Sequence, residues 1–132
     1  MSKKRVPVVL IIDDDPDIVN LAEIVLTDQG YKVQTALNGR QGMVAAFTSP
    51  PDLILMDVNM PGRDGLTLLK DIRSQPDMAN LPVIMLTGSS RPEVVSSAIH
   101  SKVNDFLLKP FDLDTLVERV TKWLPPPEKD DP

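Results

Sequence analysis

The sequence predicts an α/β domain with a single doubly wound, five-stranded parallel sheet flanked by five helices. Five short apolar runs mark the strands, and the segments between them repeat apolar residues at helical spacing. Right-handed crossovers return each strand in the same direction, so this alternation predicts a parallel sheet covered on both faces. The runs span residues 6–12, 31–35, 53–56, 83–86 and 106–108.

The first predicted helix follows the first strand directly. Asp15 is a suitable N-cap, Pro16 suits the first helical position, and Gly30 ends the helix. The apolar residues of this segment fall on one helical face. They are Ile18, Leu21, Ala22, Val25 and Leu26.

The last predicted helix covers residues 112–124, with Asp112 as its cap. Its apolar stripe predicts one buried face, and Trp123 is expected to pack near its end. The three middle helices are predicted at Gly39–Thr48, Gly65–Ser74 and residues 91–101, with Asp64 as the N-cap of the second.

Composition limits the class of protein. The 132 residues are 42% apolar and fit one domain, predicted over residues 1–124, with the proline-rich residues 125–132 as a disordered tail or the stub of a linker. The net charge of -5 argues against direct nucleic-acid binding. There is no cysteine, and no run approaches the roughly 20 apolar residues of a membrane helix. We therefore expect a cytoplasmic protein without membrane insertion.

Polar residues converge at one edge of the predicted sheet. The first strand ends in Asp13 and Asp14, the third in Asp57, the fourth in Thr87 and the fifth in Lys109. Parallel strands place their carboxyl ends at one edge, where open α/β sheets bind ligands. Each residue alone has an ordinary explanation as a cap, turn or solvated charge. Only a common site explains why all of them follow apolar strands.

Three carboxylates held together must either raise a pKa or bind a cation. Mg²⁺ suits them, because it prefers oxygen ligands, whereas zinc or copper would need the His and Cys that this chain scarcely has. With a cation and Lys109 beside Asp57, this carboxylate can attack phosphorus. The residues thus predict formation of an aspartyl phosphate.

These motifs resemble the response-regulator receiver domain of two-component signalling, similar to the chemotaxis response regulator. The resemblance rests on the Asp13–Asp14 pair and on MDVNMPGRDG, LTGSS and LLKPF, and it covers residues 6–124. It implies a flavodoxin-like sheet of order 2-1-3-4-5. It also implies a phosphorylation-activated switch that catalyses its own phosphoryl transfer and autodephosphorylation.

The resemblance assigns a role to each site residue. Asp57 would accept the phosphoryl group from a phosphohistidine, and Mg²⁺ would be held by Asp13, Asp14, Asp57 and the backbone carbonyl of Asn59. Lys109 would pair with the phosphoryl group and, in similar domains, precedes a cis bond to Pro110. Thr87 and Phe106 would form the switch, while Asn59 and Ser89 would tune the phosphoryl lifetime.

The resemblance also implies partners. The donor would be a sensor histidine kinase or a phosphotransfer protein. The signal would leave through the face formed by the predicted helix at 91–101, the fifth strand and the last helix. It would reach a downstream protein target or an effector domain of a longer chain, and the sequence does not distinguish these two outputs.

Two features depart from the family pattern. Receivers often carry Gly-Ala before the fifth strand, whereas this chain has Ser101 and Lys102. A lysine is a poor left-handed C-cap, so the end of the helix at 91–101 is in doubt. Phe106 stands where many relatives have Tyr, so an inward ring could pack but could not donate a hydroxyl hydrogen bond.

Two other classes of protein compete. An aspartate-nucleophile phosphatase of the haloacid-dehalogenase type would use Asp13 as nucleophile and Asp15, Thr87, Lys109 and Asp112 in support, but it leaves MDVNMPGRDG unexplained. An interaction module that kept the receiver fold without phosphorylation is the other alternative. The aspartate that carries the phosphoryl group distinguishes these classes.

Overall fold

The computed structural model describes residues 6–58, 60, 65–88, 96, 99 and 102–127. Within them five strands form one parallel sheet of order β2-β1-β3-β4-β5, which confirms the predicted order. The strands are β1 (Val8–Ile12), β2 (Lys32–Ala36), β3 (Leu53–Asp57), β4 (Val83–Thr87) and β5 (Asp105–Leu108).

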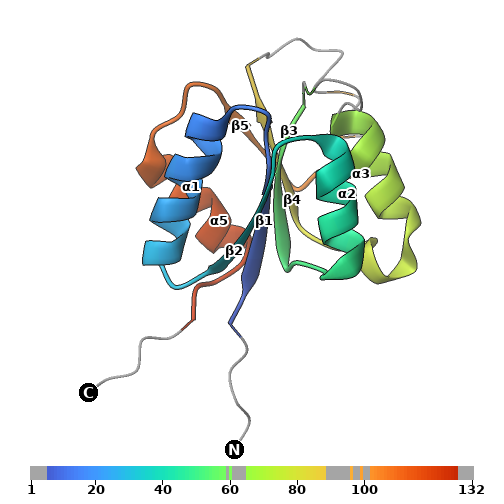
Figure 1. The fold of residues 1–132 in the computed structure, drawn as a ribbon, viewed down its shortest axis with the longest axis horizontal. Coiled ribbons are helices and arrows are strands. Elements are labelled where there is room, and N and C mark those ends of the chain that lie inside the picture. The colour runs from blue at the N-terminus through green and yellow to red at the C-terminus, as the bar shows by residue number, and fades with distance from the viewer. Residues whose placement is uncertain are drawn as a thin grey trace, which may run out of the picture.

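Helices cover both faces of this sheet, with α1 and α5 on one side and α2 and α3 on the other (Figure 1). In the described part of the chain they are α1 (Pro16–Asp28), α2 (Gly39–Thr48), α3 (Gly65–Ser74) and α5 (Leu113–Trp123), with a short 3₁₀ helix η1 (Pro76–Met78). Of the helix predicted at residues 91–101, only Ser96 and Ile99 are described. The fifth α-helix therefore stays a prediction.

The core consists of two apolar layers separated by the sheet. Every residue of β3 and β4 is buried, and alternate side chains point to opposite faces. The layer under α2 and α3 includes Leu10, Ile54, Met56, Leu69 and Met85. The layer under α1 and α5 includes Ile11, Leu26, Leu55, Ile84 and Leu116.

The predicted N-caps of α1 and α5 and the predicted stop of α1 are confirmed. The Asp15 carboxylate accepts a hydrogen bond from the Asp17 N–H at 2.9 Å, and the Asp112 carboxylate accepts one from the Thr115 N–H at 2.7 Å. Hydrogen bonds from the side chain and then the N–H of Thr115 lower the pKa of Asp112. Gly30, just beyond α1, has a left-handed φ of 103°.

Lys102 corrects one expectation. We expected a lysine to be a poor left-handed cap, yet Lys102 has a φ of 65° and its N–H donates to the Ile99 carbonyl at 3.0 Å. The guanidinium of Arg73, from α3, donates two hydrogen bonds to the Lys102 carbonyl. Contacts from a distant helix therefore offset the local strain.

The carboxyl-terminal segment packs against the end of α1. The Tyr31 hydroxyl donates a hydrogen bond to the Leu124 carbonyl, and burial raises the pKa of Tyr31 to about 12. The ring of Pro127 lies so close to Gly30 that a Cβ at Gly30 would come within 2.9 Å of it. Residues 125–127 lie outside any helix or strand.

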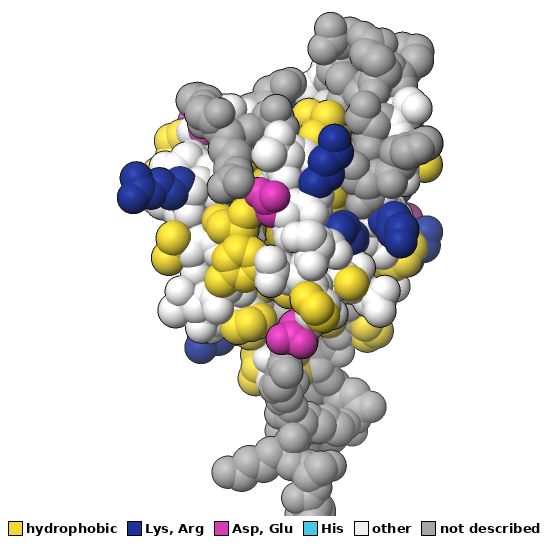
Figure 2. All heavy atoms as spheres, turned by 90° about the vertical axis from the view of Figure 1, so that its right-hand side faces the viewer, with side chains coloured by type: hydrophobic (Ala, Val, Ile, Leu, Met, Phe, Trp, Pro, Cys, Tyr) yellow, Lys and Arg dark blue, Asp and Glu magenta, His cyan; other side chains and the backbone are white. Residues whose placement is uncertain are grey.

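Exposed apolar side chains lie on the outer surface of α2 and just before its first turn. Leu37, Val44 and Phe47 are each more than two-fifths exposed. The space-filling view of the α2 and α3 side shows hydrophobic side chains gathered beside Lys and Arg side chains, with few acidic ones (Figure 2). None of the described helices is both long and apolar enough to cross a membrane.

Candidate functional site

The site is positioned by the carboxyl ends of β1, β3 and β4. Asp57 is the last residue of β3, and its neighbour Val58 continues the ladder by donating to the Leu86 carbonyl at 3.0 Å. Asp13 directly follows β1 and donates its N–H to the Ala36 carbonyl at 3.1 Å. The strands thus deliver these carboxylates to one edge, as predicted.

Three carboxylates meet at this edge. One oxygen from each of Asp13, Asp14 and Asp57 lies within 4.8 Å of the others. Asp13 has no exposed surface and Asp57 only 4%, whereas Asp14 is exposed. Burying two acids side by side is costly without a cation, because the low dielectric strengthens their repulsion.

Lys109 supplies part of the compensating charge. Its Nζ lies 2.7 Å from Oδ2 of Asp13 and 3.4 Å from Oδ2 of Asp57. Burial alone would lower the pKa of Lys109, but the hydrogen bonds and charges of Asp13 and Asp57 outweigh it and raise the pKa above its usual 10.5. Lys109 therefore stays protonated at physiological pH.

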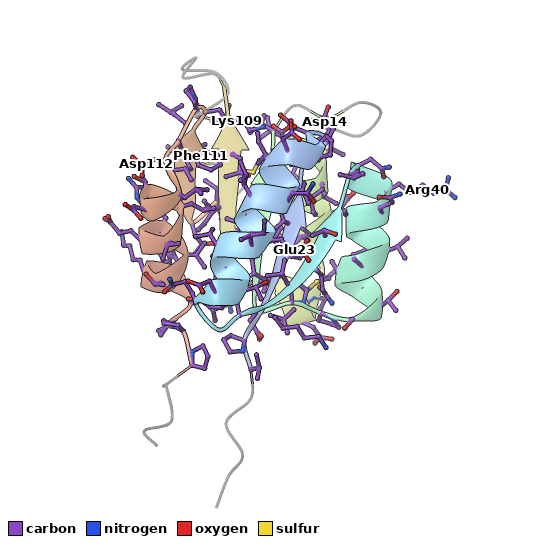
Figure 3. All side chains as sticks on the ribbon, turned by 60° about the vertical axis from the view of Figure 1, so that its left-hand side comes forward. Asp14, Glu23, Arg40, Lys109, Phe111 and Asp112 are labelled. Atoms are coloured by element: carbon purple, nitrogen blue, oxygen red, sulfur yellow. The ribbon has the colours of Figure 1, made fainter. Side chains whose placement is uncertain are left out.

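Backbone contacts hold Lys109 and the first carboxylate in place. The Lys109 N–H donates to the Thr87 carbonyl at 2.7 Å, and the Lys109–Pro110 peptide bond is cis, as the resemblance implied. Oδ1 of Asp13 accepts a hydrogen bond from the Asp15 N–H at 2.9 Å. Lys109 and Asp14 lie at the same end of the sheet in the side-chain view (Figure 3).

Thr87 and Phe106 lie on the two neighbouring strands beside the site. Thr87 is the last residue of β4 and is 1% exposed, so it is buried at the same edge of the sheet as Asp57. Phe106 pairs with Met85 in the β4–β5 register and packs, half-buried, against the core layer under α2 and α3. Asn59 and Ser89, the remaining predicted site residues, lie outside the described residues.

Gly65 is a site residue that the sequence analysis did not identify. Its N–H donates to the Val58 carbonyl at 2.9 Å. A Cβ at Gly65 would come within 2.3 Å of the Asp57 carbonyl oxygen, so only glycine fits this contact with the end of β3. A glycine opening a predicted helix just after MDVNMPGRD was the available signal.

The donor set fits a hard divalent cation. All three side chains offer carboxylate oxygens, and among the described contacts the single ammonium of Lys109 balances one of the three negative charges. The chemistry of the donors therefore agrees with Mg²⁺. Asp15 and Asp112, which a phosphatase of the haloacid-dehalogenase type would use, serve instead as helix caps.

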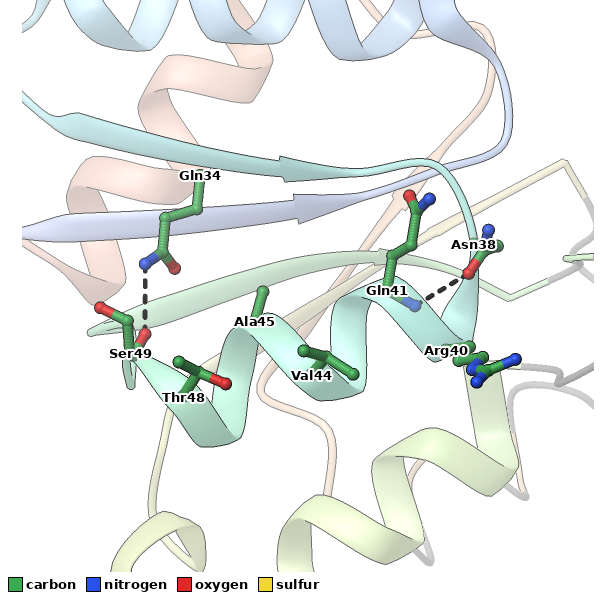
Figure 4. Close-up of a pocket in the computed structure, with 8 residues that line it drawn as sticks. All are labelled: Gln34, Asn38, Arg40, Gln41, Val44, Ala45, Thr48 and Ser49. Atoms are coloured by element: carbon green, nitrogen blue, oxygen red, sulfur yellow. Dashed lines mark hydrogen bonds between the residues drawn. The ribbon is translucent and has the colours of Figure 1, made fainter.

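A separate hollow of about 660 Å³ lies between the edge strand β2 and α2 (Figure 4). It is lined mainly by polar side chains, among them Gln34, whose Nε2 donates to the Ser49 carbonyl at 3.2 Å, and Gln41. None of the site carboxylates lines it. It is therefore distinct from the carboxylate cluster.

The family model of the response regulator receiver domain matches residues 9–121. The chain belongs to this family, whose members are phosphorylation-activated switches of two-component systems. Receiver domains generally bind Mg²⁺ at an acidic cluster and interact with histidine kinases and effector domains. The predicted family and its general function are thus confirmed.

Several known proteins are similar to this chain. The transcriptional regulator RpaA of Synechocystis is 39% identical over 118 residues, which are 89% of this chain and 49% of RpaA. The regulatory protein KdpE of Staphylococcus aureus is 35% identical, over 85% of this chain and 47% of KdpE. The chain thus spans about half the length of these relatives. The chemotaxis protein CheY4 of Vibrio cholerae superposes with a TM-score of 0.86 at 32% identity, covering 91% of this chain and all of CheY4.

Proposed function

We propose that Asp57 is the phosphoryl acceptor of this receiver and that Asp13, Asp14, Asp57 and the Asn59 carbonyl hold Mg²⁺. The observation that carries the proposal is the position of Asp57. Its carboxylate ends a fully buried strand, shares a cluster with Asp13 and Asp14, and has the Lys109 ammonium 3.4 Å away. A nucleophile, a cation-binding set and a fixed positive charge are the groups that phosphoryl transfer to a carboxylate requires.

In the proposed reaction an Asp57 carboxylate oxygen attacks the phosphorus of a phosphohistidine. The new P–O bond forms as the P–N bond breaks, and the bonding electrons leave with the imidazole nitrogen. Lys109 stabilises the negative charge on the phosphoryl oxygens, and the divalent cation would supply further charge neutralisation there. Later attack by water on phosphorus releases phosphate and restores the carboxylate.

The proposed switch uses the residues beside the acceptor. The Thr87 hydroxyl moves to hydrogen-bond a phosphoryl oxygen, and Phe106 turns further inward into the space released. Because Phe106 lacks a hydroxyl, the ring acts through packing alone. The signal leaves through the segment at 91–101, β5 and α5 as a shift between two conformations. Asn59 and Ser89 tune how readily water reaches the phosphoryl group.

An apolar surface beside the site supports a helical phosphodonor as the partner. Leu21, Ile24 and Leu113 are between one-third and two-thirds exposed on α1 and α5. Two hollows of about 650 and 240 Å³ lie among them, and the smaller reaches Pro110, next to Lys109. A sensor histidine kinase or phosphotransfer protein that packs a helix here would bring its phosphohistidine to Asp57.

The proposal extends to location and to chain organisation. Histidine kinases form phosphohistidine from ATP, so the exchange belongs in the cytoplasm. We propose a receiver domain over residues 1–124, with 125–132 as a tail or the stub of a linker. The output is a downstream protein or an effector domain, without direct nucleic-acid binding or membrane insertion by this domain.

The test is phosphorylation by acetyl phosphate in the presence of Mg²⁺, followed by intact-mass and peptide analysis. Wild type should gain one alkali-labile phosphoryl group on Asp57. Asp57→Asn should gain none, and EDTA should prevent labelling. The matched control is Asp28→Asn, which removes one exposed carboxylate from α1 and should be labelled like wild type.

Other outcomes contradict the proposal in distinct ways. A label on Asp13 would favour the aspartate-nucleophile phosphatase. Absence of label with both acetyl phosphate and an active histidine kinase would favour the unphosphorylated interaction module.

A further inference from the structure

The Arg73 guanidinium forms hydrogen bonds with backbone segments that are far apart in the sequence. Nη1 donates to the carbonyls of Met78 and Leu81 at 3.1 and 2.7 Å. Nε and Nη2 both donate to the Lys102 carbonyl, at 3.2 and 2.9 Å, and Nη2 also donates to Oδ1 of Asn104 at 3.0 Å. These five hydrogen bonds join the end of α3 to the turns before β4 and before β5.

The bonds to Lys102 coincide with the strained residue of this region. Lys102 is the only non-glycine residue with a left-handed φ in the described part of the chain. A side chain in that conformation crowds its own carbonyl, so the conformation persists where surrounding contacts enforce it. The fork of Arg73 provides such contacts, because two of its donors meet the same carbonyl oxygen.

The contacts continue through Asn104 to the first residue of β4. The Asn104 N–H donates to the Val83 carbonyl at 2.9 Å, and Oδ1 of Asn104 accepts the Val83 N–H at 2.9 Å. Arg73 therefore acts on the starts of β4 and β5. The far ends of these two strands carry Thr87 and Lys109, whose backbones are hydrogen-bonded at 2.7 Å.

We propose that Arg73 is a positioning residue of the switch: it holds Lys102 in its left-handed conformation and so fixes the carboxyl-terminal anchor of the connection between β4 and β5. Loss of the Arg73 contacts frees this anchor, so Lys102 and Asn104 leave their present positions without phosphorylation. Glycine at position 102 takes the same conformation without strain, so in the Lys102→Gly variant this conformation depends much less on the hydrogen bonds from Arg73. The link to phosphorylation rests on the function proposed above, whereas the link between Arg73 and Lys102 does not.

The test is hydrogen exchange by mass spectrometry on the full chain. The variants are Arg73→Gln, Arg73→Lys, Lys102→Gly and the double variant Arg73→Gln with Lys102→Gly. Lys70→Gln is the matched control, because it removes a lysine charge from an exposed position of the same helix. Arg73→Lys keeps the charge and loses the fork.

Arg73→Gln should speed exchange at the amides of Val83, Lys102 and Asn104 by about tenfold, with exchange in α1 and β2 unchanged. Arg73→Lys should show a smaller increase at the same amides, and Lys70→Gln none. Lys102→Gly should raise the thermal midpoint by about 2–4 °C and, in the double variant, reverse most of the local increase. Uniform acceleration in all segments, or a lower midpoint for Lys102→Gly, would overturn the proposal.

A second arm adds acetyl phosphate and Mg²⁺. The change in exchange on phosphorylation should be smaller in Arg73→Gln than in wild type, because the anchor is already free. An equal change in both proteins would overturn the role of Arg73 in the switch. If wild type is not phosphorylated, the function proposed for Asp57 fails, while the exchange results still decide whether Arg73 holds Lys102.

Discussion

The ammonium of Lys109 lies 2.7 Å from Oδ2 of Asp13, a carboxylate without exposed surface, and 0.7 Å closer to it than to Oδ2 of Asp57 at 3.4 Å. The lysine thus neutralises the most buried acid of the cluster. Lys109, which is expected to pair with the phosphoryl group, therefore also stabilises the folded protein by reducing the repulsion between the buried carboxylates.

Lys109→Gln should therefore destabilise the protein. Without the ammonium, the buried carboxylates of Asp13 and Asp57 lose the positive charge that lies 2.7 and 3.4 Å from them, so the free energy of unfolding should fall by about 2–3 kcal/mol in metal-free buffer. Urea denaturation followed by fluorescence of Trp123, the only tryptophan, measures it. Adding Asp13→Asn should recover much of the loss. Lys32→Gln, at an exposed position of β2, is the control and should be nearly neutral.

Asp14→Asn tests the cation site. The variant removes a ligand and also relieves repulsion, so we expect a thermal midpoint at or above that of wild type in EDTA. Mg²⁺ should raise the midpoint of wild type, because a ligand that binds only the folded state stabilises it, and should raise that of Asp14→Asn far less. Asp28→Asn should respond like wild type. An equal response of Asp14→Asn would exclude Asp14 as a ligand.

Alkaline pH should destabilise the fold through Tyr31. Its pKa is about 12 in the folded state against about 10 when unfolded, so the neutral hydroxyl contributes stability below pH 10 that is lost as the pH rises through 12. The raised pKa of Lys109 acts in the same direction above its usual 10.5. Tyr31 is the only tyrosine, so absorbance at about 295 nm follows it directly. A native midpoint near 10 would contradict the burial of its hydroxyl.

Tyr31→Phe provides the comparison for this pH dependence. The variant loses the hydrogen bond to Leu124 and should start with a lower thermal midpoint at pH 8. Its midpoint should then fall less than that of wild type between pH 9.5 and 11.5, because the Tyr31 contribution is absent while the Lys109 contribution remains. The two slopes separate the contributions of the two groups.

Gly65→Ala should damage the site from outside the carboxylate cluster. The added methyl would meet the Asp57 carbonyl oxygen at 2.3 Å, so the backbone must shift, and we expect a loss of about 2–3 kcal/mol together with slower labelling of Asp57. Gly88→Ala is the matched control for stability, because a Cβ there has no atom within 4 Å. Similar losses in both variants would show that the contact at Gly65 is not the cause.

The sequence predicted the elements whose signals are local. The apolar runs of β3 and β4 have no polar interruption, and Asp15 and Asp112 cap their helices as expected. The predicted bounds of α2 and α3 match the structure. Strand ends differed by one or two residues. In β3 and β4 the strand is one residue longer than predicted, because Asp57 and Thr87 continue the backbone ladder although their side chains are polar.

Contacts between distant segments could not be predicted from these patterns. Periodicity shows which face of α3 is buried, but it does not show that Arg73 reaches the Lys102 carbonyl. The intrinsic preference of lysine alone therefore predicts a poor left-handed cap at Lys102. The three residues of η1 are too few to show a period, and the closeness of Gly65 to Asp57 arises only when the chain is folded.

Because β3 is buried over its whole length, substitutions in this strand and substitutions on the surface of α1 and α5 should have different consequences. Any polar substitution or one-residue slip in this strand would displace Asp57 and cost core packing at once. The apolar surface of α1 and α5 lies outside this constraint, since its side chains are partly in solvent. Under the docking proposed above, substitutions on this surface would change which partner binds while Asp57 stays in place.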